Sequence, residues 1–228
     1  MPIARFKKLR VDCADPERLG LFWSRALDRT WRAYDDDQGG VFGLTPRHTI
    51  WFARVAQPKT VKNRVHFDIY ARNLADLEML GATVLLPQGD DRKWTVMADP
   101  EGNEFCAFLR DQLPEDRLHG LVVDCADPHA QAQWWADVYS APVEHDEKGW
   151  STVEKIPDMP ILTFDFNTVP EPKTAANRVR WEVGVADVRQ LVDAGARILR
   201  EPDSSSDVTL LADPEGNEFS ASVQPPTR

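Results

Sequence analysis

An internal duplication restricts the fold of this chain more than any other feature of its sequence. The block VDCADPERLGLFWSRAL, which begins at Val11, recurs as VDCADPHAQAQWWADVY from Val123. Two later blocks, PKTVKNRVHFDI and ADPEGNEFCAF, recur as PKTAANRVRWEV and ADPEGNEFSAS. Because the three blocks keep their order and nearly their spacing, the chain consists of two copies of one ancestral unit.

The boundary between the copies is predicted in the polar segment DQLPED, which contains a proline as linkers often do. We therefore expect one domain over residues 1–111, a linker over 112–116 and a second domain over 117–228. Each copy is long enough to bury a hydrophobic core.

Each copy predicts the order strand, helix and three strands, twice over. In the first copy, a strand over 6–13 leads to Asp15 and Pro16, a helix N-cap followed by proline at the first helical position. The helix runs through Ala26, and short strands follow near 31–34, 40–44 and 49–55. The pattern then repeats, with a strand over 64–70, a helix over 74–80 and strands near 82–86, 94–98 and 104–109. The chain thus holds four βαβββ units, whose sheets would carry helices on one face and leave a concave face for a ligand.

Composition excludes several classes of protein. The formal net charge of −10 and the pI near 5.0 disfavour nucleic acid as a partner, since its phosphates would be repelled. No apolar run approaches the roughly 20 residues of a membrane helix, so we expect no membrane partner. The basic N-terminal residues lack a following apolar region, which favours a cytoplasmic protein without a secretory signal. Three scattered cysteines do not suggest a disulfide framework or a zinc motif.

The paired βαβββ units, the Asp-Pro helix start and the DPEGNEF turn resemble the vicinal oxygen chelate superfamily. That superfamily includes glyoxalase I, extradiol dioxygenases and bleomycin-resistance proteins. The runs PKTVKNRVHFD and DPEGNEFC resemble, more narrowly, the actinobacterial group of glyoxalase-like domains. The resemblance implies an α+β fold of two tandem glyoxalase-like domains, each with two βαβββ units that form a curved mixed sheet around a ligand cup.

Enzymes of this superfamily typically hold a divalent metal through three positions, which can be transferred to each copy. The first-strand position is Lys8 in one copy and Gly120 in the other. His119 is adjacent to Gly120, but alternation along a strand predicts that its side chain faces the other way. The remaining positions are His66 and Cys106 in the first copy, and Arg180 and Ser220 in the second. The usual ligand set is therefore broken in both copies, the two sites are expected to differ, and no cofactor is expected.

Two alternative interpretations assign a metal-binding or catalytic site to the first copy. Because His66 and Asp68 share a strand face and Glu104 and Cys106 share another, the four side chains would form an irregular metal site if both faces line the cup. Cys106 and His66 would alternatively form a nucleophile–base pair. The repeated Asn63–Arg64 and Asn177–Arg178 are expected to tie turns to a neighbouring sheet. Glu104 and Glu218 would then pair with those arginines.

The leading hypothesis is a small-molecule-binding protein without the usual metal, which sequesters a natural product or drug. The alternative is a metal-dependent lyase, isomerase or dioxygenase. A homodimer is compatible with either. Trp23, Trp134 and Trp135 are expected in the core, whereas Trp51, Trp94 and Trp181 lie on predicted strands, each with one face toward the cup. The expected ligand-binding residues are Lys8, Trp51, His66, Asp68, Trp94, Glu104, Arg180, Glu182 and Ser220.

Overall fold

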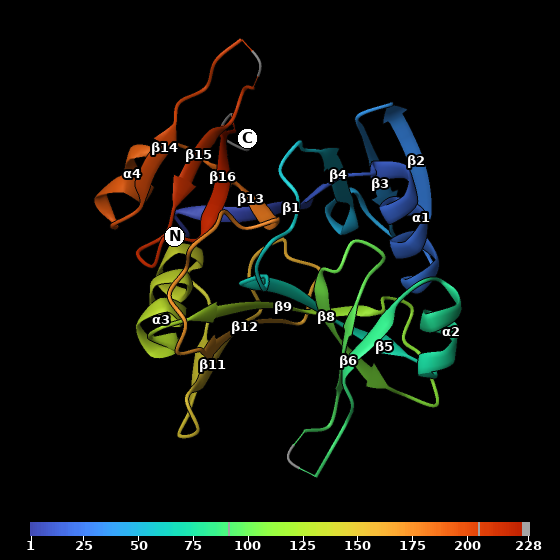
Figure 1. Ribbon diagram of the computed structural model, residues 1–228. Coiled ribbons are helices and arrows are strands. Elements are labelled where there is room, and N and C mark those ends of the chain that lie inside the picture. The colour runs from blue at the N-terminus through green and yellow to red at the C-terminus, as the bar shows by residue number, and fades with distance from the viewer. Residues whose placement is uncertain (91, 205, 225–228) are drawn as a thin grey trace.

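The computed structural model describes residues 1–90, 92–204 and 206–224, and places them in two eight-stranded mixed sheets (Figure 1). Sheet A has the strand order β14-β15-β16-β13-β1-β4-β3-β2, and sheet B has the order β10-β11-β12-β9-β5-β8-β7-β6. Each sheet is curved and contains two βαβββ units, as expected from the sequence. No helix in the described part of the chain is both long and apolar enough to span a membrane.

The first copy contributes one unit to each sheet. Its first unit comprises β1 (Ala4–Cys13), α1 (Pro16–Ala26), β2 (Thr30–Asp35), β3 (Gln38–Phe42), the 3₁₀ helix η1 (Pro46–His48) and β4 (Ile50–Arg54). Its second unit comprises β5 (Val65–Ala71), α2 (Leu74–Met79), β6 (Thr83–Leu86), β7 (Thr95–Ala98) and β8 (Glu104–Leu109). These bounds follow the predicted elements to within a few residues.

The second copy is divided in the same way. Its first unit comprises β9 (Leu118–Cys125), α3 (Pro128–Tyr139), β10 (Val143–Asp146), β11 (Trp150–Glu154) and β12 (Thr163–Thr168). Its second unit comprises β13 (Val179–Val185), α4 (Arg189–Asp193), β14 (Arg197–Arg200), β15 (Thr209–Ala212) and β16 (Glu218–Val223).

The two copies exchange units, which the sequence left undecided. Strand β1 pairs with β13 in sheet A, and β5 pairs with β9 in sheet B, both antiparallel. Each sheet therefore joins a unit of the first copy to a unit of the second. A ligand cup formed by one sheet must consequently contain residues from both copies.

Both helix starts have the geometry that the repeated Asp-Pro predicts. The Asp15 carboxylate accepts a hydrogen bond from Arg18 N, and Asp127 accepts one from Ala130 N. Each aspartate thereby satisfies one of the free N–H groups at a helix N-terminus, and the following proline fits the first helical position. The same two residues thus begin α1 and α3 in the two copies.

A single hydrophobic core lies between the sheets, with α1 and α3 at its two ends (Figure 1). The ring of Trp23, on α1, meets Phe67 of sheet B edge to face at 5.3 Å between centroids. The ring of Trp135, on α3, meets Trp181 of sheet A at 5.1 Å. Trp134, expected in the core, is only partly buried and packs edge to face on Trp135. Because the apolar faces meet, the two polar faces of the sheets are turned outward.

Candidate functional site

The two outward faces form two cups with different sets of residues at the positions transferred from the superfamily. Cup A is the outer face of sheet A, and cup B is the outer face of sheet B. The pairing of β1 with β13 brings Lys8 together with Arg180 and Ser220 in cup A. The pairing of β5 with β9 brings His66 and Cys106 together with Gly120 in cup B. The sequence left open whether a cup forms within one copy or between copies; each cup in fact combines positions of both copies, and the two cups differ.

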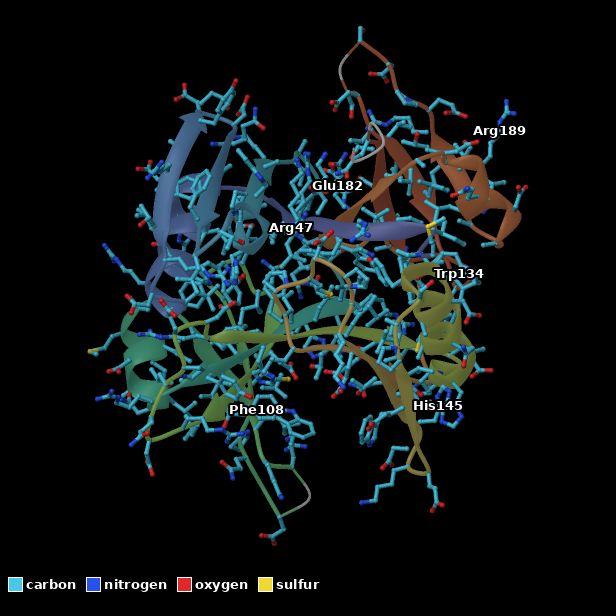
Figure 2. All side chains as sticks on the ribbon, turned by 180° about the vertical axis from the view of Figure 1, so that it is seen from behind. Arg47, Phe108, Trp134, His145, Glu182 and Arg189 are labelled. Atoms are coloured by element: carbon cyan, nitrogen blue, oxygen red, sulfur yellow. The ribbon has the colours of Figure 1, made fainter. Side chains whose placement is uncertain are left out.

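Cup B contains a cavity of about 520 Å³. Its floor is formed by the central strands β5, β8, β9 and β12, and its walls include aromatic side chains from both copies. The indole ring of Trp94 stacks on the Phe108 ring at 5.4 Å between centroids. Trp150 lies on β11 and is 39% exposed. Phe108 points to the outer side of sheet B (Figure 2). The cavity thus suits a flat or apolar molecule.

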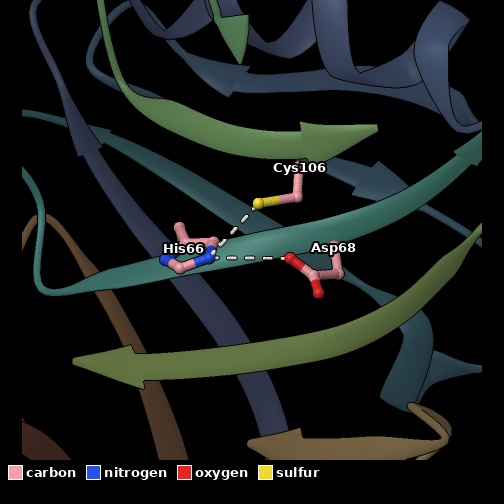
Figure 3. A group of neighbouring side chains, drawn as sticks. All are labelled: His66, Asp68 and Cys106. Carbon is pink, nitrogen blue, oxygen red and sulfur yellow. Dashed lines mark hydrogen bonds and ion pairs between the residues drawn. The ribbon is translucent and has the colours of Figure 1, made fainter. Parts of the chain in front are cut away.

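Three side chains that can bind a metal converge on the floor of this cavity (Figure 3). His66 and Asp68 project from β5, and Cys106 projects from the parallel neighbour β8. His66 Nε2 lies 3.6 Å from Cys106 Sγ and 3.6 Å from Asp68 Oδ1. All three donor atoms lie within 4.8 Å of one another. The predicted convergence of His66, Asp68 and Cys106 is therefore present.

Burial favours the uncharged forms of these three groups at neutral pH. Desolvation lowers the pKa of His66 to about 4, which favours the neutral imidazole. Desolvation, together with the nearby Asp165 carboxylate, raises the pKa of Asp68 to about 8. Burial also raises the pKa of the Cys106 thiol far above its ordinary value. The predicted Cys106–His66 pair is in contact, but its environment disfavours the thiolate that a nucleophile needs.

Asp68 has a buried oxygen atom that no hydrogen bond reaches within the described part of the chain. This atom, Oδ1, faces His66 Nε2 at a distance that is long for a hydrogen bond. An unsatisfied buried polar atom costs about 1–3 kcal/mol, so natural structures usually supply a partner. The Asp68 carboxyl group is therefore positioned to meet a group that enters from the cavity.

Glu104, the fourth member of the predicted metal site, has another role. Its carboxylate accepts hydrogen bonds from Lys59 Nζ at 2.9 Å and from the Asn63 backbone N–H at 3.0 Å. Glu218 makes the equivalent contacts with Lys173 and Asn177. The predicted pairing of these glutamates with Arg64 and Arg178 was wrong. Both carboxylates tie the repeated loop before a central strand to the sheet.

The two repeated arginines join the copies instead. Arg64 donates to the backbone carbonyl of Glu171, and Arg178 donates to that of Gln57. A cavity of about 600 Å³ lies between these two loops. At its edge, Lys62 forms an ion pair with Asp124. The polar groups around this cavity thus bind one another, and the cavity lies where the loops of the two copies contact each other.

His119 lies on the cup face of sheet B, so the prediction that it points away was wrong. A β-bulge interrupts the β5–β9 register between Asp68 and Ile69: Gly120 pairs with Asp68 and Leu118 pairs with Ile69, so His119 is the extra residue. A bulge places two consecutive side chains on one face of the strand. The His119 ring stacks on Tyr70 at 4.1 Å and meets Phe108 edge to face at 4.8 Å. It therefore supports the aromatic wall of cup B.

Gly120 leaves space that two acidic side chains occupy. A Cβ atom at this position would lie 2.9 Å from Asp68 Cβ and 3.5 Å from Asp165 Oδ2. Asp165 accepts hydrogen bonds from Thr152 and Thr163. The usual first-strand ligand is thus replaced in space by a neighbouring carboxyl group. The sequence analysis missed Asp165. Its only local signal is that it alternates with Thr163 along a strand, and the pairing of that strand with β9 is visible only in the structure.

In cup A the transferred positions hold cations. Lys8 Nζ lies 3.1 Å from Glu182 Oε2, and Arg180 forms an ion pair with Asp12. Trp51 lies on the cup face, with Lys8 Nζ 5.7 Å from its ring centroid. Trp181 is buried in the core. Two cations at two of the three usual ligand positions do not fit a divalent metal, because like charges repel.

The fold and the two cups together define a protein of the vicinal oxygen chelate type. The chain belongs to the Glyoxalase-like domain family, which matches residues 8–108 and 120–222. The structure is similar to that of glyoxalase I from Zea mays, with a TM-score of 0.67 and 14% identity over 96% of this chain and 92% of that one. It is also similar to a putative dioxygenase from Bacillus subtilis subsp. subtilis str. 168, with a TM-score of 0.67 and 12% identity over 99% of this chain and 86% of that one. No curated protein matches the sequence. At these identities, the structural similarity shows the fold alone.

Proposed function

We propose that the chain is a small-molecule-binding protein and that cup B is its main binding site. The observation that carries this proposal is the unsatisfied Asp68 Oδ1 at the floor of an aromatic-walled cavity. A ligand that donates a hydrogen bond would satisfy this atom, while its flat apolar body would contact Trp94 and Phe108. Sequestration of a natural product or drug would require no further chemistry.

At the floor of the cavity, the neighbouring carboxyl groups of Asp68 and Asp165 favour a neutral or cationic ligand. Its described charged lining residues are the acidic Asp68, Glu104 and Asp165 and the basic Lys62 and Arg92. Glu104 is paired with Lys59, and Lys62 is paired with Asp124. A cation bound next to Asp68 would favour its ionised form, so binding would release a proton at neutral pH. An anionic ligand next to Asp68 would not gain this favourable ionisation of the carboxyl group.

Thermal-shift and calorimetric screening of planar natural products tests this proposal. We expect a cationic compound such as berberine to stabilise the protein more than a carboxylate of similar size. Replacement of Phe108 by alanine should weaken binding about tenfold, because the ligand loses its stacking surface. Replacement of Phe42 by alanine, in cup A, is the matched control and should leave this binding unchanged. Equal loss in both variants would contradict a site in cup B.

A metal-dependent lyase, isomerase or dioxygenase is the second candidate, favoured by the geometry of the three converging donor atoms. A tetrahedral zinc ion with ordinary bond lengths places its sulfur and nitrogen ligands about 3.6 Å apart, which is the separation of Cys106 Sγ and His66 Nε2. His66, Asp68 and Cys106 would hold the metal, which would supply Lewis-acid chemistry to a bound substrate. Cup B therefore fits a metal, whereas cup A does not.

Elemental analysis of purified protein after incubation with zinc, nickel, manganese and ferrous iron distinguishes the two candidates. His66→Ala is the test variant, and Arg180→Ala, at the equivalent position of cup A, is its matched control. Near-stoichiometric metal that is lost only in His66→Ala would establish the second candidate. Absence of retained metal in the unmodified protein would leave the metal-independent binding function.

We also propose the remaining properties that the sequence led us to expect. They are a cytoplasmic location, a homodimer, an actinobacterial source, and no nucleic-acid or membrane partner. Size-exclusion chromatography with light scattering tests the dimer directly.

A further inference from the structure

Cup A contains a second cavity, of about 570 Å³, whose lining differs in charge from that of cup B. Its charged lining residues are all cations, namely Lys7, Lys8, Arg32 and Arg47, and its aromatic lining residues include Phe42 and Trp51. In a chain with a formal net charge of −10, a cavity lined by cations runs against the average charge of the protein. The local positive charge of this cavity favours an anionic ligand.

A β-bulge produces the paired lysines. The register of β1 against β13 shifts between Phe6 and Lys8, so that Lys7 is the extra residue. Both lysines consequently contact the same carboxylate: Lys7 Nζ lies 2.6 Å and Lys8 Nζ lies 3.1 Å from the oxygens of Glu182. Strict alternation along the strand would have placed one of them in the core.

The described carboxylates at this cavity are too few to neutralise its cations. Glu182 is shared by Lys7 and Lys8. Asp158 is shared by Arg47, at 2.8 Å, and Arg5, at 3.2 Å. Each carboxylate thus serves two cations, and the surplus charge favours an anion from solution.

The aromatic residues of cup A supply a flat surface beside these cations. The Phe42 and Trp51 rings lie 5.9 Å apart, and the Arg32 guanidinium lies 5.4 Å from the Phe42 centroid. A Cβ atom at Gly40 would come within 2.8 Å of the Phe42 ring, so this ring lies directly over the strand backbone. A flat ring could stack on these side chains with its charged group near the lysines.

We propose that cup A binds a flat aromatic carboxylate through Lys7, Lys8, Phe42 and Trp51, without a metal. The ammonium groups hold the carboxylate, and the aromatic rings hold the arene. The cations thus occupy the place of the metal ligands and select an anion. This inference does not rest on the proposed function of cup B, whose cavity has acidic as well as basic lining residues.

Binding of 2-naphthoate, measured by isothermal titration calorimetry on the full chain, tests the proposal. Neutral 2-naphthylmethanol has nearly the same shape and is the comparison ligand. We expect saturable binding of naphthoate that is at least tenfold tighter than that of the alcohol, and that weakens as salt is added. Failure of naphthoate to saturate, or equal affinity for both compounds, would overturn the proposal.

Variants locate the site. Lys7→Gln and Lys8→Gln should each weaken naphthoate binding about tenfold, and each leaves Glu182 with one cationic partner. Lys148→Gln, in an exposed turn outside the cups, controls for net charge and should have no effect. Trp51→Leu should weaken binding, whereas Trp150→Leu, in cup B, should not. Loss of binding in Lys148→Gln or Trp150→Leu equal to that in Lys8→Gln or Trp51→Leu would overturn the proposal, and thermal unfolding of each variant verifies that it is folded.

Discussion

At the scale of single residues, Asp68 is the side chain whose environment departs most from that of an ordinary aspartate in cup B. It is 8% exposed, it faces Asp165, and one of its oxygens has no hydrogen-bond partner in the described structure. These conditions favour the protonated acid, and they make the stability of the protein depend on pH.

The sign of this dependence follows from the raised pKa. Between about pH 4 and 8, folded Asp68 keeps a proton that the unfolded chain has released, so rising pH favours unfolding. His66 has the opposite effect from about pH 4 to 6.5, because its pKa is lowered in the folded state. The two effects oppose each other up to pH 6.5, and only that of Asp68 continues to pH 8.

Replacement of Asp68 by asparagine therefore tests the proton on this carboxyl group. In the unmodified protein, the contribution of Asp68 should lower the free energy of unfolding by about 1–2 kcal/mol from pH 6.5 to 8. Urea denaturation at several pH values should show this decrease, and Asp68→Asn should show less of it. The same slope in both proteins would contradict a protonated Asp68.

At the scale of secondary-structure elements, two β-bulges shape the cups. The bulge in β1 brings Lys7 and Lys8 to one face of sheet A, and the bulge in β9 brings His119 and Gly120 to one face of sheet B. The bulges occur at equivalent places in the two copies, so the repeat keeps them. The residues that occupy them differ: the bulge in β1 contributes two lysines to cup A, whereas the bulge in β9 contributes none to cup B.

Gly120→Ala tests how closely the elements pack around the second bulge. The new Cβ would lie 2.9 Å from Asp68 Cβ, which belongs to a central strand and cannot move aside freely. We expect a loss of about 1–3 kcal/mol in the free energy of unfolding. Gly184→Ala is the control, because the nearest atoms to its Cβ would be those of the Gln224 side-chain amide, which can rotate away. Equal stability of the two variants would show that β9 adjusts without strain.

At the scale of the whole molecule, the exchange of units makes the two copies depend on each other. Each sheet contains strands of both copies, and one core joins the sheets. A chain of residues 1–111 alone would expose the edges of β1 and β5 that pair with β13 and β9 of the second copy.

We expect neither 1–111 nor 117–228 to form a folded monomer when expressed alone. Co-expression should yield a complex of the two with native-like cups. Circular dichroism, light scattering and cooperative unfolding measure this. A folded monomer of either half with a cooperative transition would show that the predicted domains are independent, and would contradict the mutual dependence of the copies.

The sequence by itself determined the duplication, the four βαβββ units and most element boundaries, because repeated blocks, Asp-Pro helix starts and alternating apolar residues are local signals. As an alternative, it also offered a convergence of His66, Asp68, Glu104 and Cys106, which lie on two strands of one unit, and three of these four come together. Local alternation could not reveal the bulges. The prediction therefore placed the His119 side chain on the wrong face of its strand and did not identify Lys7 as a residue of the cup. Only the tertiary structure decided which units share a sheet, because strand pairing between units depends on long-range contacts that leave no pattern in either strand alone. The same pairing decided that Lys8 joins Arg180, and that Gly120 joins His66.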